Sequence, residues 1–418
     1  MKKFILLSAC MISLLSCEKE KNTNDLESTL IISVDAATNI GYYDAKLHGE
    51  LKDLGSTKVY DYGLVWSEFT EPETDGPNKV YFGPATGDCT FETTINNLKP
   101  ATTYYFRSFY ISGSGIQYSQ ELSLVTSQMP WTKKSEFGGT ARMWAVAFSI
   151  GEKGYYGLGQ GEGNVFLNDF YEYDMKTSAW TRKSDFPGGP RINAVGFSIG
   201  NKGYVGTGLN SDYLGTSDFW EYDPAIDKWT QKADYMGGTI EFATGFSIGD
   251  KGYIGIGTRR SIGKRVSEFC EYNAATDSWS KKTDFPGTAV DKTFNLVINN
   301  KGYIGIGETP LGYSDEFWQY DPSINQWSRK NDFPGNASCY ATGFSIKKTG
   351  YVCFGRYGEN EVWEYDYLSD KWNKSVYFPG QSRHCAVSFI INDVAYLGTG
   401  STGSLYLKDF WTFSPGNK

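Results

Sequence analysis

The residues best suited to chemistry in this chain lie at one recurring place, just before a short apolar run. Arginine guanidinium groups bind carboxylates through paired hydrogen bonds, and aromatic faces stack on sugar rings. The place occurs six times with different residues: Arg142-Met143-Trp144, Arg191-Ile192-Asn193, Ile240-Glu241-Phe242, Val290-Asp291-Lys292, Ser338-Cys339-Tyr340 and Arg383-His384-Cys385. The candidate ligand-binding residues are therefore Arg142, Trp144, Arg191, Glu241, Phe242, Asp291, Lys292, Tyr340, Arg383 and His384.

Two interpretations of these residues stay open at this point. The arginines hold an acidic glycan or another carboxylated ligand, or they serve the fold, either by pairing with Glu241 and Asp291 or simply by tightening the ring. If the protein is an enzyme, Glu241, Asp291 and His384 are the candidate acid–base groups. The sequence shows no P-loop, zinc or Ser-His-Asp signature, and it predicts no cofactor and no metal site.

A tryptophan that returns every 45 to 50 residues indicates what positions these segments. Each period holds an apolar run, a Gly-rich strand such as GYIGIG, an acidic-aromatic strand such as DFWEYD, and the Trp strand. Short runs rich in Tyr, Phe, Ile and Val, broken by Gly, Pro and Asn, are typical of strands. A period of this length predicts a radial array of four-stranded sheets. The tryptophans are Trp131, Trp180, Trp229, Trp279, Trp327 and Trp372.

These Gly-rich, aromatic and Trp strands resemble the kelch repeat over residues 131–418, although the adjacent double glycine of that family is Gly-x-Gly here. The resemblance implies a six-bladed β-propeller. The last repeat lacks a Trp strand and the first Trp strand lacks a repeat before it, so we expect strand 131–137 to complete the sixth blade. The segments named above then gather on one face, at the mouth of the central channel.

Enzymes of similar architecture give two further expectations. The kelch-like galactose oxidases hold copper with two histidines and two tyrosines. This chain has only His48 and His384, in different domains, which disfavours a copper oxidase. The chain also resembles the sialic-acid mutarotases in architecture, which makes sugar mutarotation or epimerisation an alternative function.

Residues 29–127 lie outside the repeat and show alternating strand patterns over the length of one β-sandwich. The stretch from Leu98 to Tyr104 resembles the tyrosine corner of fibronectin type III domains, in which the tyrosine hydroxyl bonds to upstream backbone. The expected fold class is thus all-β: a six-bladed kelch β-propeller preceded by a fibronectin III-like β-sandwich that acts as a spacer.

The first residues indicate export. A basic start and a short apolar run predict a signal peptide over residues 1–16, and Leu14-Leu15-Ser16-Cys17 resembles a bacterial lipobox in which Cys17 is lipidated. Residues 17–28 are expected to be the lipidated Cys and a flexible tether, with acidic residues that resemble those of Bacteroidetes surface lipoproteins. The predicted location is the cell envelope, as an outer-membrane lipoprotein facing the surface or the periplasm.

The formal net charge of −8 argues against a nucleic-acid partner, and membrane contact is expected through the lipid anchor only. The predicted function is an anchored binding module for a glycan or protein partner. Mutarotation and a purely structural protein–protein platform are the alternatives. A disulfide between Cys339 and Cys385 also remains open.

Overall fold

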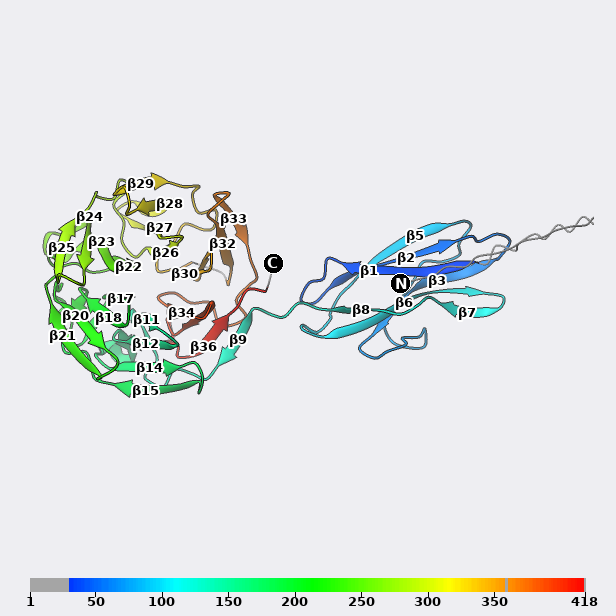
Figure 1. The fold of residues 1–418 in the computed structure, drawn as a ribbon, viewed down its shortest axis with the longest axis horizontal. Helices are drawn as coiled ribbons and strands as arrows, with labels where there is room; N and C mark the ends of the chain where they lie inside the picture. Colours follow the sequence, from blue (N-terminus) through cyan, green and yellow to red (C-terminus); the bar gives the residue numbers. More distant parts are fainter. Residues whose placement is uncertain (1–29, 358–359, 417–418) are drawn as a thin grey trace, which may run out of the picture. The chain divides into compact units, whose positions relative to one another are not determined.

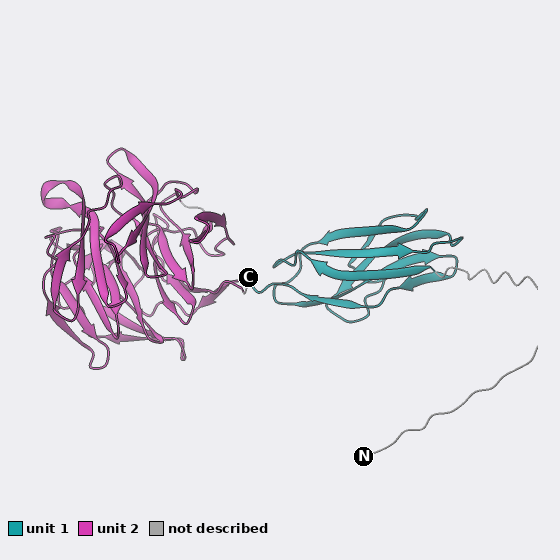
Figure 2. Ribbon diagram, turned by 45° about the horizontal axis from the view of Figure 1, so that its top comes forward, with its two compact units in different colours: residues 1–129 teal, residues 130–418 magenta. Residues whose placement is uncertain are grey.

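The chain divides into two compact units, residues 1–129 and 130–418 (Figure 2). The computed structural model describes residues 30–357 and 360–416, so the predicted signal peptide, Cys17 and the tether lie outside the described residues. Within those ranges the protein is all-β, with two short 3₁₀ turns and no α-helix, and no helix is long and apolar enough to cross a membrane.

The first unit contains two antiparallel sheets, with strand orders β1-β2-β5 and β4-β3-β6-β7, and β8 also pairs with β6. Its strands are β1 (Ile31–Thr38), β2 (Ala45–Lys52), β3 (Val59–Ser67), β4 (Lys79–Tyr81), β5 (Cys89–Ile95), β6 (Thr103–Ser112), β7 (Gly115–Tyr118) and β8 (Leu122–Val125).

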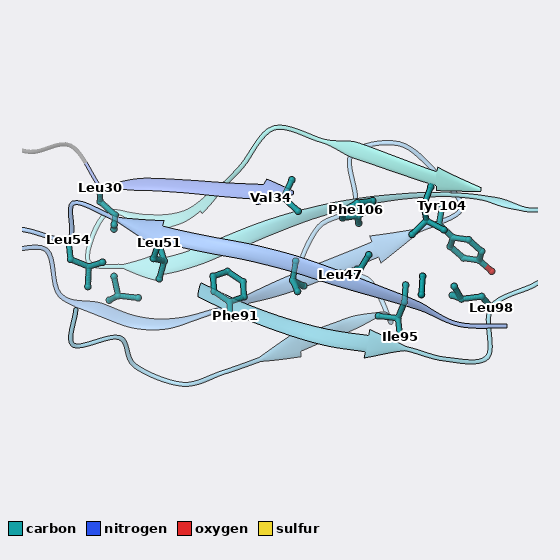
Figure 3. Close-up of a cluster of buried hydrophobic side chains, with 14 residues drawn as sticks. Leu30, Val34, Leu47, Leu51, Leu54, Phe91, Ile95, Leu98, Tyr104 and Phe106 are labelled. Atoms are coloured by element: carbon teal, nitrogen blue, oxygen red, sulfur yellow. The ribbon is translucent and has the colours of Figure 1, made fainter. Parts of the chain in front are cut away.

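The core of the first unit is an apolar cluster shared by both sheets (Figure 3). It includes Leu47 and Leu51 from β2 and Tyr104 and Phe106 from β6. Alternate residues of β2 are buried, as expected for a strand with one face on a core. The hydroxyl of Tyr104 accepts a hydrogen bond from the backbone N–H of Lys99 at 3.0 Å, which is the backbone contact expected of a tyrosine corner.

The second unit contains six four-stranded antiparallel sheets, which we number 1 to 6 in chain order. Sheet 1 is β11 (Val146–Ile150), β12 (Lys153–Gly157), β14 (Phe170–Asp174) and β15 (Ala179–Lys183); sheet 2 is β17 (Val195–Ile199), β18 (Lys202–Gly206), β20 (Phe219–Asp223) and β21 (Lys228–Lys232); sheet 3 is β22 (Thr244–Ile248), β23 (Lys251–Arg259), β24 (Lys264–Asn273) and β25 (Ser278–Lys281). Sheet 4 is β26 (Phe294–Ile298), β27 (Lys301–Thr309), β28 (Gly312–Asp321) and β29 (Gln326–Arg329); sheet 5 is β30 (Thr342–Ile346), β31 (Thr349–Cys353), β32 (Val362–Asp366) and β33 (Lys371–Lys374); sheet 6 is β34 (Val387–Ile391), β35 (Val394–Gly398), β36 (Phe410–Phe413) and β9 (Trp131–Lys134).

These sheets form a closed ring (Figure 1), an arrangement consistent with a β-propeller. The first strands of successive sheets contact one another in chain order, and β34 returns to contact β11. β9 lies beside β36, with Trp131 opposite Phe413, so the start of the unit supplies the fourth strand of sheet 6. Because the ring is closed, every sheet packs between two neighbouring sheets.

Short paired segments extend two of the sheets at the face where the second and third strands are joined. They are β10 (Arg142–Met143) with β13 (Gln160–Gly161), and β16 (Arg191–Ile192) with β19 (Leu209–Asn210); the 3₁₀ turns η1 (Glu162–Asn164) and η2 (Arg260–Ile262) lie in the same kind of loop. In sheets 3 and 4 the second and third strands themselves continue into this region.

Glycines of the second strands let neighbouring sheets approach. The Cβ of any larger residue at Gly203 would collide with the ring of Phe148, which comes from the first strand of the preceding sheet. Gly154 receives Phe389 of sheet 6 in the same way, so one packing device operates both within the ring and across its closure. The second strands therefore cannot carry side chains there without pushing adjacent sheets apart.

The recurring tryptophans connect each sheet to the preceding one. The indole N–H of Trp229 in sheet 2 donates to the carbonyl of Ser184 at the end of sheet 1, at 3.0 Å. The N–H of Ser184 donates back to Asp227, which also accepts the hydroxyl of Tyr222. We call this pair of opposed hydrogen bonds the Trp latch.

Three more copies of the Trp latch join the following sheets. They use Trp279 with Asp277 and Ala233, Trp327 with Asn325 and Thr283, and Trp372 with Asp370 and Asn331. At the two junctions that flank sheet 6 the latch is missing: the indole nitrogens of Trp131 and Trp180 are buried and have no hydrogen-bond partner among the described residues.

We predict that Trp229→Phe lowers the free energy of unfolding of the ring by about 1 kcal/mol, because it removes one hydrogen bond between neighbouring sheets. Trp180→Phe is the matched control: its indole also packs among aromatic rings but donates no hydrogen bond. Urea denaturation of the two variants checks this, and equal losses would contradict the Trp latch.

Candidate functional site

The candidate site is built on six equivalent residues, one from each sheet, at the mouth of the central channel. Trp144, Asn193, Phe242, Lys292, Tyr340 and Cys385 each stand just before the first strand of a sheet, and each has a φ between 53° and 62°. Non-glycine residues rarely adopt this left-handed conformation, so the backbone is forced to turn sharply at the same point of every sheet. We call these six residues the mouth ring.

Backbone hydrogen bonds connect the mouth ring from sheet to sheet. The N–H of Tyr340 donates to the carbonyl of Lys292 at 3.0 Å, and the N–H of Cys385 donates to the carbonyl of Tyr340 at 3.1 Å. Asn193 and Trp144, and Lys292 and Phe242, are joined in the same manner at 3.4 Å. The left-handed turn therefore positions the backbone for hydrogen bonds between sheets. These bonds do not involve the side chains, so the residue type can differ from sheet to sheet.

Aromatic side chains of the mouth ring come from alternate sheets and converge on one another. The ring centroid of Trp144 lies 6.4 Å from that of Phe242 and 6.1 Å from that of Tyr340, and Phe242 and Tyr340 are 5.8 Å apart. The ammonium group of Lys292 lies 4.9 Å from the centroid of Phe242 and 5.3 Å from that of Tyr340. All four are half-buried, so they form a cationic aromatic surface over the channel mouth, which we call the aromatic cap.

Both predicted carboxylates at the mouth are buried and paired with arginines of the sheet 3 hairpin. Glu241 lies 2.9 Å from the guanidinium of Arg260. Asp291 accepts the hydroxyl of Thr258 at 2.5 Å and lies 3.1 Å from Nε of Arg265. Burial and ion pairing together make these carboxylates poor candidates for free acid–base groups.

Glu308 joins this network to the aromatic cap. It accepts a hydrogen bond from Lys292 at 2.6 Å and one from Arg265 at 3.1 Å. Burial alone would raise the pKa of Glu308, but the hydrogen bond and charge of Lys292, with the charges of Arg265 and Arg356, outweigh burial and lower the pKa. Lys292 is thus held in place by a charged carboxylate while its ammonium group faces the rings.

His384 is half-buried at the mouth, with its ring centroid 6.0 Å from that of Tyr340. Burial, and then the positive charge of Arg356, lower the pKa of His384, so the imidazole is neutral at pH 7. Cys339 and Cys385 are buried free thiols and form no disulfide with each other. Burial raises the pKa of Cys339 to about 11, which makes this thiol unreactive.

The three arginines do not lie where a ligand could use them. Arg142, Arg191 and Arg383 are at most 2% exposed. Arg383 makes paired hydrogen bonds of 2.7 Å to both carboxylate oxygens of Asp409, and Arg191 and Arg142 do the same with Asp218 and Asp169. Each arginine also donates to backbone carbonyls near it. Arg191 donates in addition to the hydroxyl of Thr216, and its Nε is buried with no partner among the described residues.

The expectation that these arginines hold a carboxylated ligand is therefore not supported by the geometry, and they do not pair with Glu241 or Asp291 either. Burial alone would raise the pKa of Asp218, but the hydrogen bonds and charge of Arg191 outweigh it and lower the pKa. The sequence carries a signal for this pairing. The acidic-aromatic strand begins with Asp in the three repeats that contain Arg and with Glu in the other three.

Sequence reasoning also missed Arg265 and Glu308, because they belong to strand extensions that exist only in sheets 3 and 4. Below the mouth, the channel is a cavity of ≈ 260 Å³ lined by residues at the start of the first strand of all six sheets: Val146, Val195, Gly245, Asn295, Gly343 and Ser388. Among the residues described, no group of three or more His, Cys, Asp or Glu side chains could hold a metal ion.

We predict that Arg191→Ala lowers the free energy of unfolding by about 3 kcal/mol, because it removes a fully buried side chain and leaves the partly buried carboxylate of Asp218 without its counter-ion. The control is Arg356→Ala, an exposed arginine on the same face, for which a change within about 0.5 kcal/mol is expected. Thermal or chemical denaturation checks both values. An Arg191→Ala protein as stable as the wild type would contradict a structural role.

Comparison with known proteins shows the fold and no more. No family model matches the sequence, and no curated protein matches it. Among solved structures, one titled "Structure of YjhT" is similar to 68% of this chain and covers 98% of its own length, with a TM-score of 0.58 and 17% sequence identity. At this identity the likeness supports the ring of small antiparallel sheets and carries no residue-level assignment.

Proposed function

We propose that the second unit is a six-bladed kelch propeller that binds a carbohydrate at its channel mouth. The observation that carries the proposal is the aromatic cap, in which three rings from alternate sheets converge beside the ammonium group of Lys292. Half-buried aromatic faces beside a few fixed polar groups are the usual composition of a sugar site.

Charges around the aromatic cap favour a sugar that carries a carboxylate. Arg260 and Arg265 are neutralised by Glu241, Asp291 and Glu308. Arg356 is exposed, its backbone N–H is held by the carbonyl of Cys339 at 3.0 Å, and no carboxylate among the described residues pairs with it. Arg356 therefore takes the role that the sequence assigned to the three buried arginines.

The rest of the chain fits a protein held at the cell envelope. We propose that Cys17 is a lipidation site, that residues 17–28 are a tether, and that the first unit is a fibronectin III-like spacer. Its three-stranded and five-stranded sheets and the Lys99–Tyr104 hydrogen bond support the spacer assignment. An outer-membrane lipoprotein of this design presents its binding domain at a distance from the membrane.

A glycan array tests the binding proposal. We predict that the wild-type protein binds acidic glycans and that Trp144→Ala and Arg356→Ala each reduce the signal at least tenfold, because they remove the stacking face and the free cation. Tyr377→Ala, an exposed aromatic residue on an outer loop, is the control and should bind normally. Absence of any glycan binding would favour the structural protein–protein platform instead.

A second candidate function, sugar mutarotation or epimerisation, is favoured by His384. This imidazole is neutral, half-buried and next to Tyr340, so it could accept or donate a proton at a sugar bound on the aromatic cap. Glu241 and Asp291 are the weaker candidates because both are in ion pairs. Proton NMR of anomer exchange in sialic acid should show acceleration by the wild type and at least a tenfold loss in His384→Gln. Exchange at the uncatalysed rate with wild-type protein would leave binding as the function.

A further inference from the structure

The Arg–Asp pairs of sheets 1, 2 and 6 define a recurring socket for a guanidinium group. In sheet 6, Arg383 donates to Asp409, to the carbonyl of Thr399 and to the carbonyl of Gln381, and it lies 4.9 Å from the centre of the Phe378 ring. Sheets 1 and 2 repeat the carboxylate, the backbone carbonyls and the phenylalanine shelf.

Sheet 5 has the same socket without the arginine. Ser338 takes the place of Arg383, and its carbonyl accepts the N–H of Gly307 from the preceding sheet, just as the carbonyl of Arg383 accepts the N–H of Gly355. The backbone thus follows the same path, while the side chain is too short to reach the strand that carries the acid. Ser338 is buried, with 3% of its surface exposed.

A cavity of ≈ 30 Å³ lies where the guanidinium group would be. Its lining includes the counterparts of every group that holds an arginine elsewhere: Phe333 for the aromatic shelf, Asn336 and Phe354 for the carbonyls, and Glu361 for the carboxylate. Trp363 donates its indole N–H to Glu361 at 3.1 Å, as Trp411 does to Asp409. A cavity of this size has room for about two water-sized groups.

The other two sheets that lack this arginine satisfy their glutamates differently. In sheet 3, Arg259 reaches Glu268 and the carbonyl of Gly237 from the end of the second strand. In sheet 4, Glu316 accepts the N–H and hydroxyl of Thr288. In sheet 5, Glu361 accepts hydrogen bonds from Trp363 and from the exposed Lys374, whose ammonium group lies 2.5 Å away. Asn336 at the cavity is exposed, so solvent reaches this site.

We propose that the sheet 5 cavity is a binding site for a guanidinium group. The occupant is a planar cation that donates to Glu361 and to the carbonyls of Asn336 and Phe354 and stacks on Phe333. Its source is either a small guanidinium compound or an arginine side chain presented by a partner. This site lies apart from the aromatic cap and does not depend on the proposed carbohydrate function.

The test measures the melting temperature of the full chain with methylguanidinium, and with methylammonium at the same ionic strength. We expect a saturable rise of a few degrees at millimolar methylguanidinium and none with methylammonium, since only the planar cation matches the socket. Nα-acetyl-arginine amide separates the two sources. A matching rise indicates an arginine side chain, and a rise with methylguanidinium alone indicates a small compound. No rise with methylguanidinium, or equal rises with both cations, would overturn the proposal.

Filling the socket gives an independent check. The double variant Ser338→Arg, Glu361→Asp recreates the pair found in sheets 1, 2 and 6, so it should melt at or above the wild-type temperature and no longer respond to methylguanidinium. Glu361→Gln should abolish the response while retaining the wild-type circular dichroism spectrum. A folded double variant that still responds would place the cation elsewhere, and a double variant that melts well below the wild type would show that the cavity does not have the shape of the socket.

Discussion

The second unit depends on contacts between neighbouring sheets, because a single four-stranded sheet cannot bury its own two faces. Two devices supply these contacts. At four junctions a first-strand phenylalanine packs against a second-strand glycine of the next sheet. At four junctions the Trp latch joins the outer strands. The two sides of a sheet therefore differ. On one side its own tryptophan packs toward the preceding sheet, and on the other side the tryptophan of the following sheet packs toward it. Closure of the ring then fixes where every loop emerges, including those of the mouth ring.

The ring of sheets could be predicted from the sequence because its sequence pattern repeats six times. The spacing of the tryptophans, together with the Gly-rich and acidic-aromatic strands, predicted small antiparallel sheets, and the lone Trp131 strand pointed to the closing pair of β9 and β36. These features appear in nearly every repeat, so a strand that is hard to assign in one repeat can be assigned by comparison with the others.

The candidate site was harder to predict because it consists of departures from the repeat. Arg142 and its counterparts were predicted to bind a ligand, because arginine is common at binding sites. The residue type alone does not indicate that these side chains are buried. Their partners lie about 27 residues away, directly before the third strand. Trp144 and Phe242 are about a hundred residues apart in the chain, and only the turn of the ring brings them together. Arg265 and Glu308 required knowledge of strand lengths that the repeat does not give.

Pairing of β9 with β36 joins residues separated by 280 positions along the chain. At a synthesis rate of about 10 residues per second, the first strand waits roughly half a minute for its partner. Throughout that interval the growing domain has an unpaired first strand and an incomplete last sheet, both open to wrong partners. A chain that stops before β36 cannot complete sheet 6, so the ring closes only after all six repeats have been synthesised.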